Sequence, residues 1–406
     1  MHASQAQVSI SAEVRPRTEF RNGFKTLTDD SKDAAIFTEQ RSRLYLNYQD
    51  SSFKFRVAFQ DIRIWGETSQ IFKEELGKTF ISEAWGQYYF NPSLSLKVGR
   101  QIISYDNQRF LGGLEWAQQG RRHDAALLIY EKDKSKLHFG FAYNQDDDRA
   151  EPTFLQADGA GFYSVGGNYK TFQYGWYSQK IEKGAISLLA FNAGYQNADT
   201  TMSFKQTFGL IANKELGKIK FAGDVYYQTG QLNKNNVNAL LAGVNITFKT
   251  SATPITLGVE YISGKDDDDT SSDITNFSPD FGTNHAFNGY MDYFFVGPAN
   301  GNVGVTDLYI QTKFKAIGGN VKANLHHFLT GSTQLNTEGA ELDKSMGTEL
   351  DLVYIKKLKG GVVWNLGYSQ LFGTDTMEAL RGGDKGAIQA WAWTMITFKP
   401  TFFTSK

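Results

Sequence analysis

The chain has 406 residues, rich in Gly (40), Phe (31) and Tyr (20) but with only 7 Pro, and its mean hydropathy is negative. The formal net charge of −1 gives no global basic surface for nucleic acid, and the absence of cysteine excludes disulfides and thiolate metal sites. The longest apolar runs are far shorter than the roughly 20 residues that a membrane-spanning helix requires. A chain of this kind that crosses a membrane must cross it as strands.

Residues 2–7 have the small-residue pattern found at the end of a secretory signal, without the apolar core of such a signal. We expect Gln7 to lie near the mature start. Residues 1–6 are then the remnant of a signal peptide or of an added start. The rest, residues 7–403, is expected to form a single barrel domain.

Apolar and polar side chains alternate along this domain in runs of roughly ten residues. The second run sets Arg41 and Arg43 against Leu44 and Leu46, and residues 50–52 then form a hairpin turn to the third run. A period of two is that of a strand with one apolar face and one polar face. In a barrel, the apolar face meets lipid and the polar face lines the lumen.

A long polar connector follows the run that ends at Val98. Between it and the next alternating run, residues 126–130, lie Arg109, Arg121 and Arg122 among Gln and Gly. Most loops of this polarity are simply solvated. Because further arginines precede it on neighbouring runs, we expect this connector to fold inward.

Short and long connectors alternate along the chain. The short turns lie at 132–136, 179–184, 213–218, 249–254, 316–319 and 356–361. The long connectors lie at 26–36, 67–78, 105–121, 145–161, 264–304, 331–344 and 373–386. Outer-membrane barrels have short periplasmic turns and long external loops. The sequence therefore predicts an all-β fold: a transmembrane, antiparallel up-and-down β-barrel of about eighteen strands in the bacterial outer membrane, with both chain ends on the periplasmic side.

The last run, residues 388–403, is rich in aromatic side chains. It contains Trp391 and Trp393 and ends on Phe402 and Phe403, just before the end of the chain. An aromatic final strand is typical of outer-membrane barrels. We interpret Trp and Tyr near strand ends as an interface girdle rather than as a platform for substrate.

The arginines are concentrated in the first third of the chain, and only Arg149 and Arg381 come later. The others are Arg15, Arg17, Arg21, Arg41, Arg43, Arg56, Arg63, Arg100, Arg109, Arg121 and Arg122. A guanidinium fork holds a carboxylate or sulfate at two points, which suits the guidance of an acidic sugar. The alternative is a structural lattice in which carboxylates of the same wall neutralise the arginines. Those carboxylates are Glu13, Glu19, Glu39, Asp61 and Glu83.

Three other clusters are weaker candidates for a metal site or a catalytic site. Residues 266–269 are four aspartates without the alternating spacing of an EF-hand calcium loop, so we interpret them as a solvated external loop. His326 and His327 point to opposite faces of a strand and cannot readily share a metal. No serine lies near enough in sequence to His123 and Asp124 to complete a triad. We therefore predict no catalytic residue, no metal site and no cofactor.

Seven segments resemble the alginate export family of outer-membrane porins. They are residues 13–19 (EVRPRTE), 40–44 (QRSRL), 99–101 (GRQ), 108–112 (QRFLG), 120–124 (GRRHD), 281–285 (FGTNH) and 288–293 (NGYMDY). The resemblance covers nearly the whole chain and implies a monomeric eighteen-stranded barrel whose arginine-rich constriction conducts an anionic polysaccharide outward. One departure is the tight turn at 179–184, where the family's alginate exporter has a long periplasmic gating loop. Either the gating or the cargo differs here.

Together these features predict a passive channel with an anion-preferring constriction, passing acidic saccharides as in alginate export, or related anions. The residues expected to line the pore are Glu13, Arg15, Arg17, Glu39, Arg41, Arg43, Arg56, Glu83, Arg100, Arg109, Arg121 and Arg122. The expected partners are outer-membrane lipid and an anionic polysaccharide or oligosaccharide, with no nucleic acid and no second subunit. Three alternatives stay open: a general porin for small solutes, a barrel hydrolase, and the barrel subunit of a surface complex. The cargo, the direction of transport and the gate are left open by the sequence.

Overall fold

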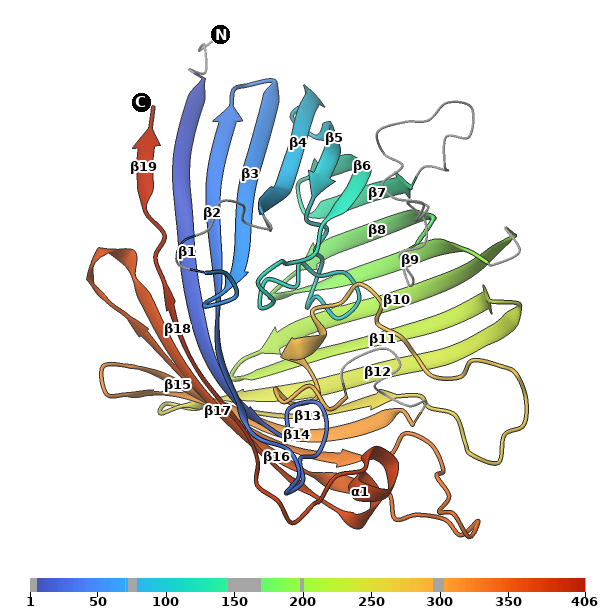
Figure 1. Cartoon of the computed structure of the whole chain (residues 1–406). Coiled ribbons are helices and arrows are strands. Elements are labelled where there is room, and N and C mark those ends of the chain that lie inside the picture. The colour runs from blue at the N-terminus through green and yellow to red at the C-terminus, as the bar shows by residue number, and fades with distance from the viewer. Residues whose placement is uncertain are drawn as a thin grey trace.

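The computed structural model of the chain describes residues 6–69, 71, 79–144, 169–197, 201–294 and 303–405. Residues 1–5 of the predicted leader remnant, most of the predicted connector 67–78, and the connector 145–161 with Arg149 lie outside these ranges. In the described part, successive strands pair antiparallel, and the first strand also pairs with the last two (Figure 1). The sheet is thereby closed, and the predicted all-β up-and-down barrel is confirmed.

The strands vary from 4 to 16 residues in length. They are β1 (Gln7–Asn22), β2 (Ala35–Gln49), β3 (Phe53–Ile64), β4 (Thr79–Asn91), β5 (Leu94–Gln101), β6 (His123–Lys132), β7 (Ser135–Tyr143), β8 (Thr171–Ile181), β9 (Gly184–Gln196), β10 (Met202–Leu216), β11 (Ile219–Leu232), β12 (Asn235–Lys249), β13 (Pro254–Ile262), β14 (Val305–Ala316), β15 (Gly319–Leu329), β16 (Ser345–Lys357), β17 (Val363–Gly373), β18 (Gln389–Thr397) and β19 (Thr401–Thr404). Segments β18 and β19 both pair with β1, and Phe398 between them bridges to Val14, so they form one strand of the wall. The barrel therefore has the predicted eighteen strands.

The described residues outside the strands include one short α-helix, α1 (Asp375–Arg381), and the 3₁₀ turns η1 (Asn284–Ala286) and η3 (Lys359–Gly361). In this part of the chain, no helix is long and apolar enough to cross a membrane.

Alternation along the strands separates a lipid face from a lumen face. On β2, Leu44 and Leu46 are 39% and 37% exposed on the outer face, whereas Arg41 and Arg43 are 2% and 5% exposed on the lumen face. Successive side chains of a strand point to opposite sides, so the apolar set meets lipid and the charged set turns inward. The faces predicted for this strand are confirmed.

Connector length distinguishes the two ends of the barrel. Tight turns such as residues 182–183, between β8 and β9, occupy the end at which β1 begins and β19 ends (Figure 1). Most connectors at the other end are long, but those at 197–201 and 233–234 are short, so the predicted alternation fails there. Both residues of the 233–234 turn have positive φ, the geometry of a two-residue hairpin turn.

Two long connectors fold into the lumen (Figure 1). We call residues 102–122 the inward connector and residues 263–294 the second connector. Phe110 of the first and Phe281 of the second are buried, with ring centroids 6.0 Å apart. They pack against aromatic side chains that the opposite wall directs inward, namely Phe172, Tyr174, Phe191 and Tyr226. Burial of each such side chain contributes about 1.5–3 kcal/mol to the stability of the fold. Because these rings point inward, the hydrophobic core of this barrel lies inside its lumen.

The tryptophans of the final strand belong to this core. Trp391 and Trp393 are 1% and 7% exposed and face the lumen, and Trp393 lies 4.8 Å from the Trp116 ring of the inward connector. Their interpretation as girdle residues is wrong, because their positions on β18 share the lumen face with other buried side chains. Trp364 does lie on the outer face, where its Nε1 donates to Thr394 Oγ1 at 3.0 Å.

Candidate functional site

Strands β1, β2 and β3 direct arginines into the lumen, and together these form what we call the arginine wall. Its members are Arg15, Arg17, Arg41, Arg43 and Arg56. Strand pairing places Arg15 directly opposite Arg41. Like charges in opposed positions destabilise a sheet unless other groups neutralise them. The wall therefore requires acceptors.

Carboxylates of the same strands supply some of these acceptors. Arg41 Nε donates to Glu13 Oε1 at 2.8 Å, and Arg17 Nε donates to Glu19 Oε1 at 2.7 Å. Arg17 also reaches Glu39, at 3.3 Å between Nη2 and Oε2. The ion pairs that the structural-lattice alternative predicts are therefore present for Glu13, Glu19 and Glu39.

Arg56 is the most accessible member of the wall, with 32% of its side chain exposed. Its Nε lies 3.6 Å from Glu83 Oε1, and its guanidinium carbon lies 4.7 Å from the ring centroid of Tyr45. This arginine faces the open part of the lumen, whereas the other four are buried.

The inward connector supplies the remaining acceptors through its backbone. Arg15 Nη1 donates to the carbonyl oxygen of Glu115 at 2.8 Å, and Arg17 Nη1 donates to that of Trp116 at 2.8 Å. The Arg17 guanidinium carbon also lies 4.2 Å from the centroid of the Trp116 ring. The wall thus holds the backbone of the connector inside the lumen.

One carboxylate of the connector joins three arginines. Glu115 lies 2.6 Å from Arg43, 2.8 Å from Arg122 and 3.3 Å from Arg41, measured between the nearest nitrogen and oxygen atoms. Burial opposes ionisation of this carboxyl group, but the guanidinium groups outweigh it and lower the pKa of Glu115 to about 2. Glu115 is therefore charged at all physiological pH values.

Arg109 and Arg121 join the inward connector to groups beyond the arginine wall. Arg109 makes a two-point pair with Glu260 on β13, at 2.6 Å and 3.1 Å, and also donates to Asn288 Oδ1 at 2.8 Å. Arg121 Nη1 donates to the carbonyl oxygen of Gly282 in the second connector at 2.6 Å, and burial lowers its pKa to about 10. The two connectors therefore form one body inside the barrel.

Two residues predicted on the lumen side lie on the outer face. Arg100 pairs with Asp124 outside the barrel, at 2.9 Å and 2.7 Å, and both side chains are about half exposed. Side chains two residues apart on a strand point to the same face, so Arg100 shares its face of β5 with the lipid-facing Val98. Asp61 likewise faces outward, where it pairs with Arg63 at 2.7 Å.

The histidines occupy structural positions. His123 faces the lumen, 3.0 Å from the Tyr169 hydroxyl, while its neighbour in sequence points outward, so the two form no catalytic pair. His326 lies in the lumen, 2.9 Å from Asp307, and His327 lies on the other face of the strand, as predicted. Within the described ranges, no group of three or more His, Asp or Glu side chains is placed to hold a metal ion.

A comparison with families of known proteins decides what this barrel is. The sequence matches the family described as Alginate export over residues 6–392. The chain belongs to the alginate export family. This family membership identifies a channel of the bacterial outer membrane rather than an enzyme.

This alginate export family member also resembles solved porins of Pseudomonas aeruginosa. The outer membrane protein OpdK superposes with a TM-score of 0.64 at 8% identity, covering 98% of this chain and 99% of OpdK. OpdL superposes with a TM-score of 0.63 at 11% identity, covering 98% of this chain and 99% of OpdL. At such low identities the likeness shows the fold alone. No curated protein matches the sequence.

The predicted pore-lining residues leave out two lumen cations of this family member, Lys54 on β3 and Lys97 on β5. Alternation places Lys54 on the polar face with Arg56, and it could have found Lys97 in the same way. Lys97 stands between the outward-facing Leu96 and Val98, and Lys54 shares its face with Arg56. They were overlooked because lysine was assigned mainly to turns.

Proposed function

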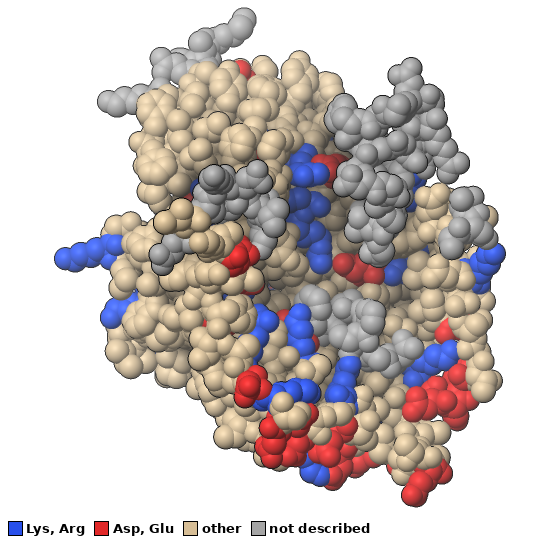
Figure 2. All heavy atoms as spheres, viewed as in Figure 1, with Lys and Arg blue, Asp and Glu red and all other residues tan. Residues whose placement is uncertain are grey.

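We propose that this outer-membrane channel prefers anions and passes acidic saccharides, with the arginine wall and the inward connector forming its constriction. One observation carries the proposal: on the lumen face of β1–β5, cations outnumber carboxylates. The cations are Arg15, Arg17, Arg21, Arg41, Arg43, Lys54, Arg56 and Lys97, and the carboxylates are Glu13, Glu19, Glu39 and Glu83. Figure 2 shows Lys and Arg in the hollow of the barrel, with some Asp and Glu beside them.

Charges along a narrow pore raise the local concentration of counter-ions. Glu115 of the inward connector adds one further negative charge, which it shares among three guanidinium groups. The lumen face of β1–β5 therefore keeps an excess of positive charge after its ion pairs are formed. Arg121 and Arg122 add to it from the inward connector. An anion that approaches the constriction therefore gains electrostatic energy and a cation loses it.

Acidic saccharides suit this lining by their carboxylates and hydroxyls. Guanidinium groups bind carboxylates at two points, and the lumen also offers amides and hydroxyls as neutral partners. The expected setting is a single barrel in outer-membrane lipid, with an anionic polysaccharide or oligosaccharide as its cargo.

A second candidate is a channel for small organic anions. The two connectors that fill the lumen favour it, because a polymer would have to pass beside or displace them. The fold neighbour OpdK has been solved with vanillate, an aromatic carboxylate. Block of the current by vanillate but not by an oligouronate would select this candidate.

Reversal potentials in planar bilayers test the proposal directly. Under a potassium chloride gradient, the purified protein should pass chloride better than potassium, and an oligouronate should reduce the current. The variant Arg41→Glu with Arg43→Glu should shift selectivity toward cations and weaken the block. If the double variant at the buried Arg41 and Arg43 does not fold, Arg56→Glu, at the more accessible position, tests the same shift in selectivity. A cation-selective wild type, or variants with unchanged selectivity and block, would contradict the proposal.

A further inference from the structure

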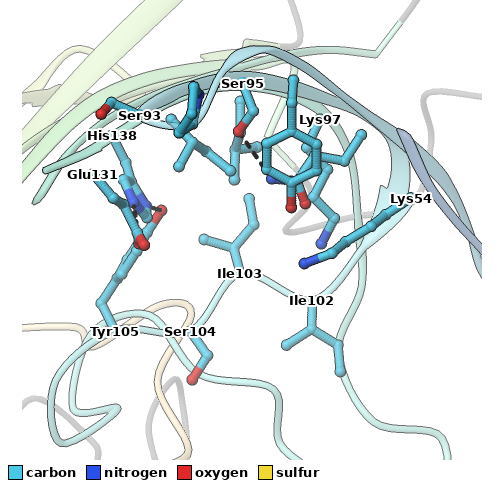
Figure 3. Close-up of a pocket in the computed structure, with 15 residues that line it drawn as sticks. Lys54, Ser93, Ser95, Lys97, Ile102, Ile103, Ser104, Tyr105, Glu131 and His138 are labelled. Atoms are coloured by element: carbon cyan, nitrogen blue, oxygen red, sulfur yellow. Dashed lines mark hydrogen bonds and ion pairs between the residues drawn. The ribbon is translucent and has the colours of Figure 1, made fainter. Parts of the chain in front are cut away.

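A cavity lies in the lumen near the short turns, next to the inward connector (Figure 3). It adjoins the arginine wall at Arg56, which shares the lumen face of β3 with Lys54. Its volume is about 360 Å³, and pockets that hold small ligands measure roughly 300–1,000 Å³. Side chains of β3–β7 surround it, and residues 102–105 of the inward connector form one side. No member of the arginine wall lines it.

Two lysines enter the cavity from alternate strands. Gln87 on β4 stands opposite Lys54 on β3 and opposite Lys97 on β5, so the three side chains form a row across the sheet. Strands are spaced by roughly 4.8 Å, which puts the two lysine backbones about 10 Å apart. Figure 3 shows both side chains on the same side of the cavity. Side chains of this length can converge on a single anion.

Within the described ranges neither lysine forms a close ion pair with a carboxylate, although Glu83, which pairs with Arg56, attracts Lys97 from farther away. Lys54 Nζ lies 5.3 Å from the ring centroid of Tyr89, and Lys97 Nζ lies 3.9 Å from that of Trp85. Ring faces attract ammonium groups but carry no net charge. Both lysines are half-buried, so an entering carboxylate gains two ammonium partners that are partly withdrawn from water.

Hydrogen-bonding groups face the lysines across the cavity, among them the carboxylate of Glu131, which pairs with Lys136 at 2.8 Å. The Tyr105 hydroxyl lies 3.0 Å from His138 Nδ1, and His138 Nε2 lies 3.2 Å from Glu131 Oε1 (Figure 3). Gln87 Nε2 donates to Ser95 Oγ at 2.9 Å. The remaining lining is apolar and includes Ile102, Ile103, Leu127 and Ile129. The cavity thus combines a cationic side, hydroxyl partners, an apolar surface and one carboxylate that is already paired with Lys136.

From this arrangement we propose that the Lys54–Lys97 cavity is a binding subsite for one sugar-acid ring, entered from the end of the short turns. The carboxylate lies between the two ammonium groups, the hydroxyls bond across the cavity, and the apolar face of the ring lies on the isoleucines. The role of this subsite in transport rests on the proposed function, because the ring is either a free sugar acid or one unit of the acidic polymer.

Calorimetry with the purified full chain in detergent tests the subsite, using galacturonate and tetragalacturonate as probes. Lys54→Gln and Lys97→Gln should each weaken galacturonate binding about tenfold, the effect of losing one charge-assisted hydrogen bond. The matched control is Lys356→Gln, at a lysine on the outer face near the same end of the barrel, which should bind like wild type. Tetragalacturonate that binds no better than galacturonate identifies a site for free sugar acids, and much tighter binding identifies a site for the polymer.

The outcomes separate this inference from the proposed function. Unchanged galacturonate binding in both lysine variants, or an equal loss in Lys356→Gln, overturns the subsite even if the channel is anion-selective and blocked by oligouronates. Conversely, a cation-selective channel whose galacturonate binding is lost in the lysine variants keeps the subsite and rejects the anion-preferring constriction. Failure of wild type to bind either probe also overturns the subsite.

Discussion

Arg43 on β2 donates a hydrogen bond to Glu115 of the inward connector, with 2.6 Å between Nη1 and Oε2. The two residues are 72 positions apart, and this contact links the wall of the barrel to the connector inside it. The same carboxylate serves Arg122 at 2.8 Å. Removal of this one negative charge should therefore loosen the contact between the connector and the arginine wall.

We predict that Glu115→Gln makes opening of the constriction more frequent. The Glu115 side chain is 42% exposed, so solvent screening limits the loss to about 1 kcal/mol, which corresponds to roughly a fivefold increase in open events. Single-channel recording measures this directly. Glu341→Gln, an exposed position in another long connector, serves as the control and should leave the recording unchanged. Equal opening of both variants would show that the Glu115 contacts do not hold the connector.

The low pKa of Glu115 predicts how the constriction responds to acid. The folded-state pKa of about 2 lies below the ordinary value of 4.5, so the ion pairs contribute fully above about pH 4.5. Their contribution decreases as the pH falls from about 4.5 toward 2, because the carboxyl group becomes protonated. Open events of wild type should thus increase only over this acidic window, as single-channel recording can show. Glu115→Gln should lack that component, and an identical acid response in wild type and variant would contradict the assignment.

Arg109 and Arg100 were both predicted to line the pore, but we expect them to contribute very differently to the free energy of unfolding. Arg109 and Glu260 are 1% and 7% exposed, and removal of one partner of a buried pair costs about 3–5 kcal/mol. Arg100 pairs with Asp124 in an exposed position, where such pairs contribute roughly 0.2–1 kcal/mol. Arg109→Ala should lower the free energy of unfolding far more than Arg100→Ala in denaturant titrations in detergent. Similar losses for both variants would be evidence against the buried network.

The barrel itself could be predicted because its signals are periodic. Alternation fixes the face of each strand residue, and applied strictly it would also have placed Arg100 outside, since Leu94, Leu96 and Val98 have the same parity. The even strand number and the tight turn at 182–183 likewise follow from turn residues and run lengths.

The interior of the barrel could not be predicted in the same way. Contacts such as Arg43 with Glu115 depend on how an aperiodic connector crosses the lumen, and no spacing in the sequence encodes that path. The same limit applies to Trp391 and Trp393, whose aromatic character suits a lipid interface as well as a core. Their position was decided by the two connectors that pack against them inside the lumen.

The last prediction tests the assignment of faces on β2, where lipid-facing and lumen-facing residues adjoin. Leu46 lies on the outer face, and an arginine there would enter the hydrocarbon, at a cost of about 2–4 kcal/mol near the bilayer midplane. Its neighbour Tyr45 faces the lumen, where its ring lies 4.7 Å from the Arg56 guanidinium. Leu46→Arg should therefore impair stability in lipid, while Tyr45→Gln should cost less than about 1 kcal/mol, the upper range for an accessible cation–ring contact.

Denaturant titrations of the two variants in lipid vesicles measure this difference. Because a shift of one residue would exchange every side chain between lumen and lipid, the comparison tests the whole strand and not only these two positions. A Tyr45→Gln variant as unstable as Leu46→Arg, or a Leu46→Arg variant as stable as wild type, would mean that the two faces of β2 are reversed. The arginine wall would then face lipid, and the anion-preferring constriction would lose its structural basis.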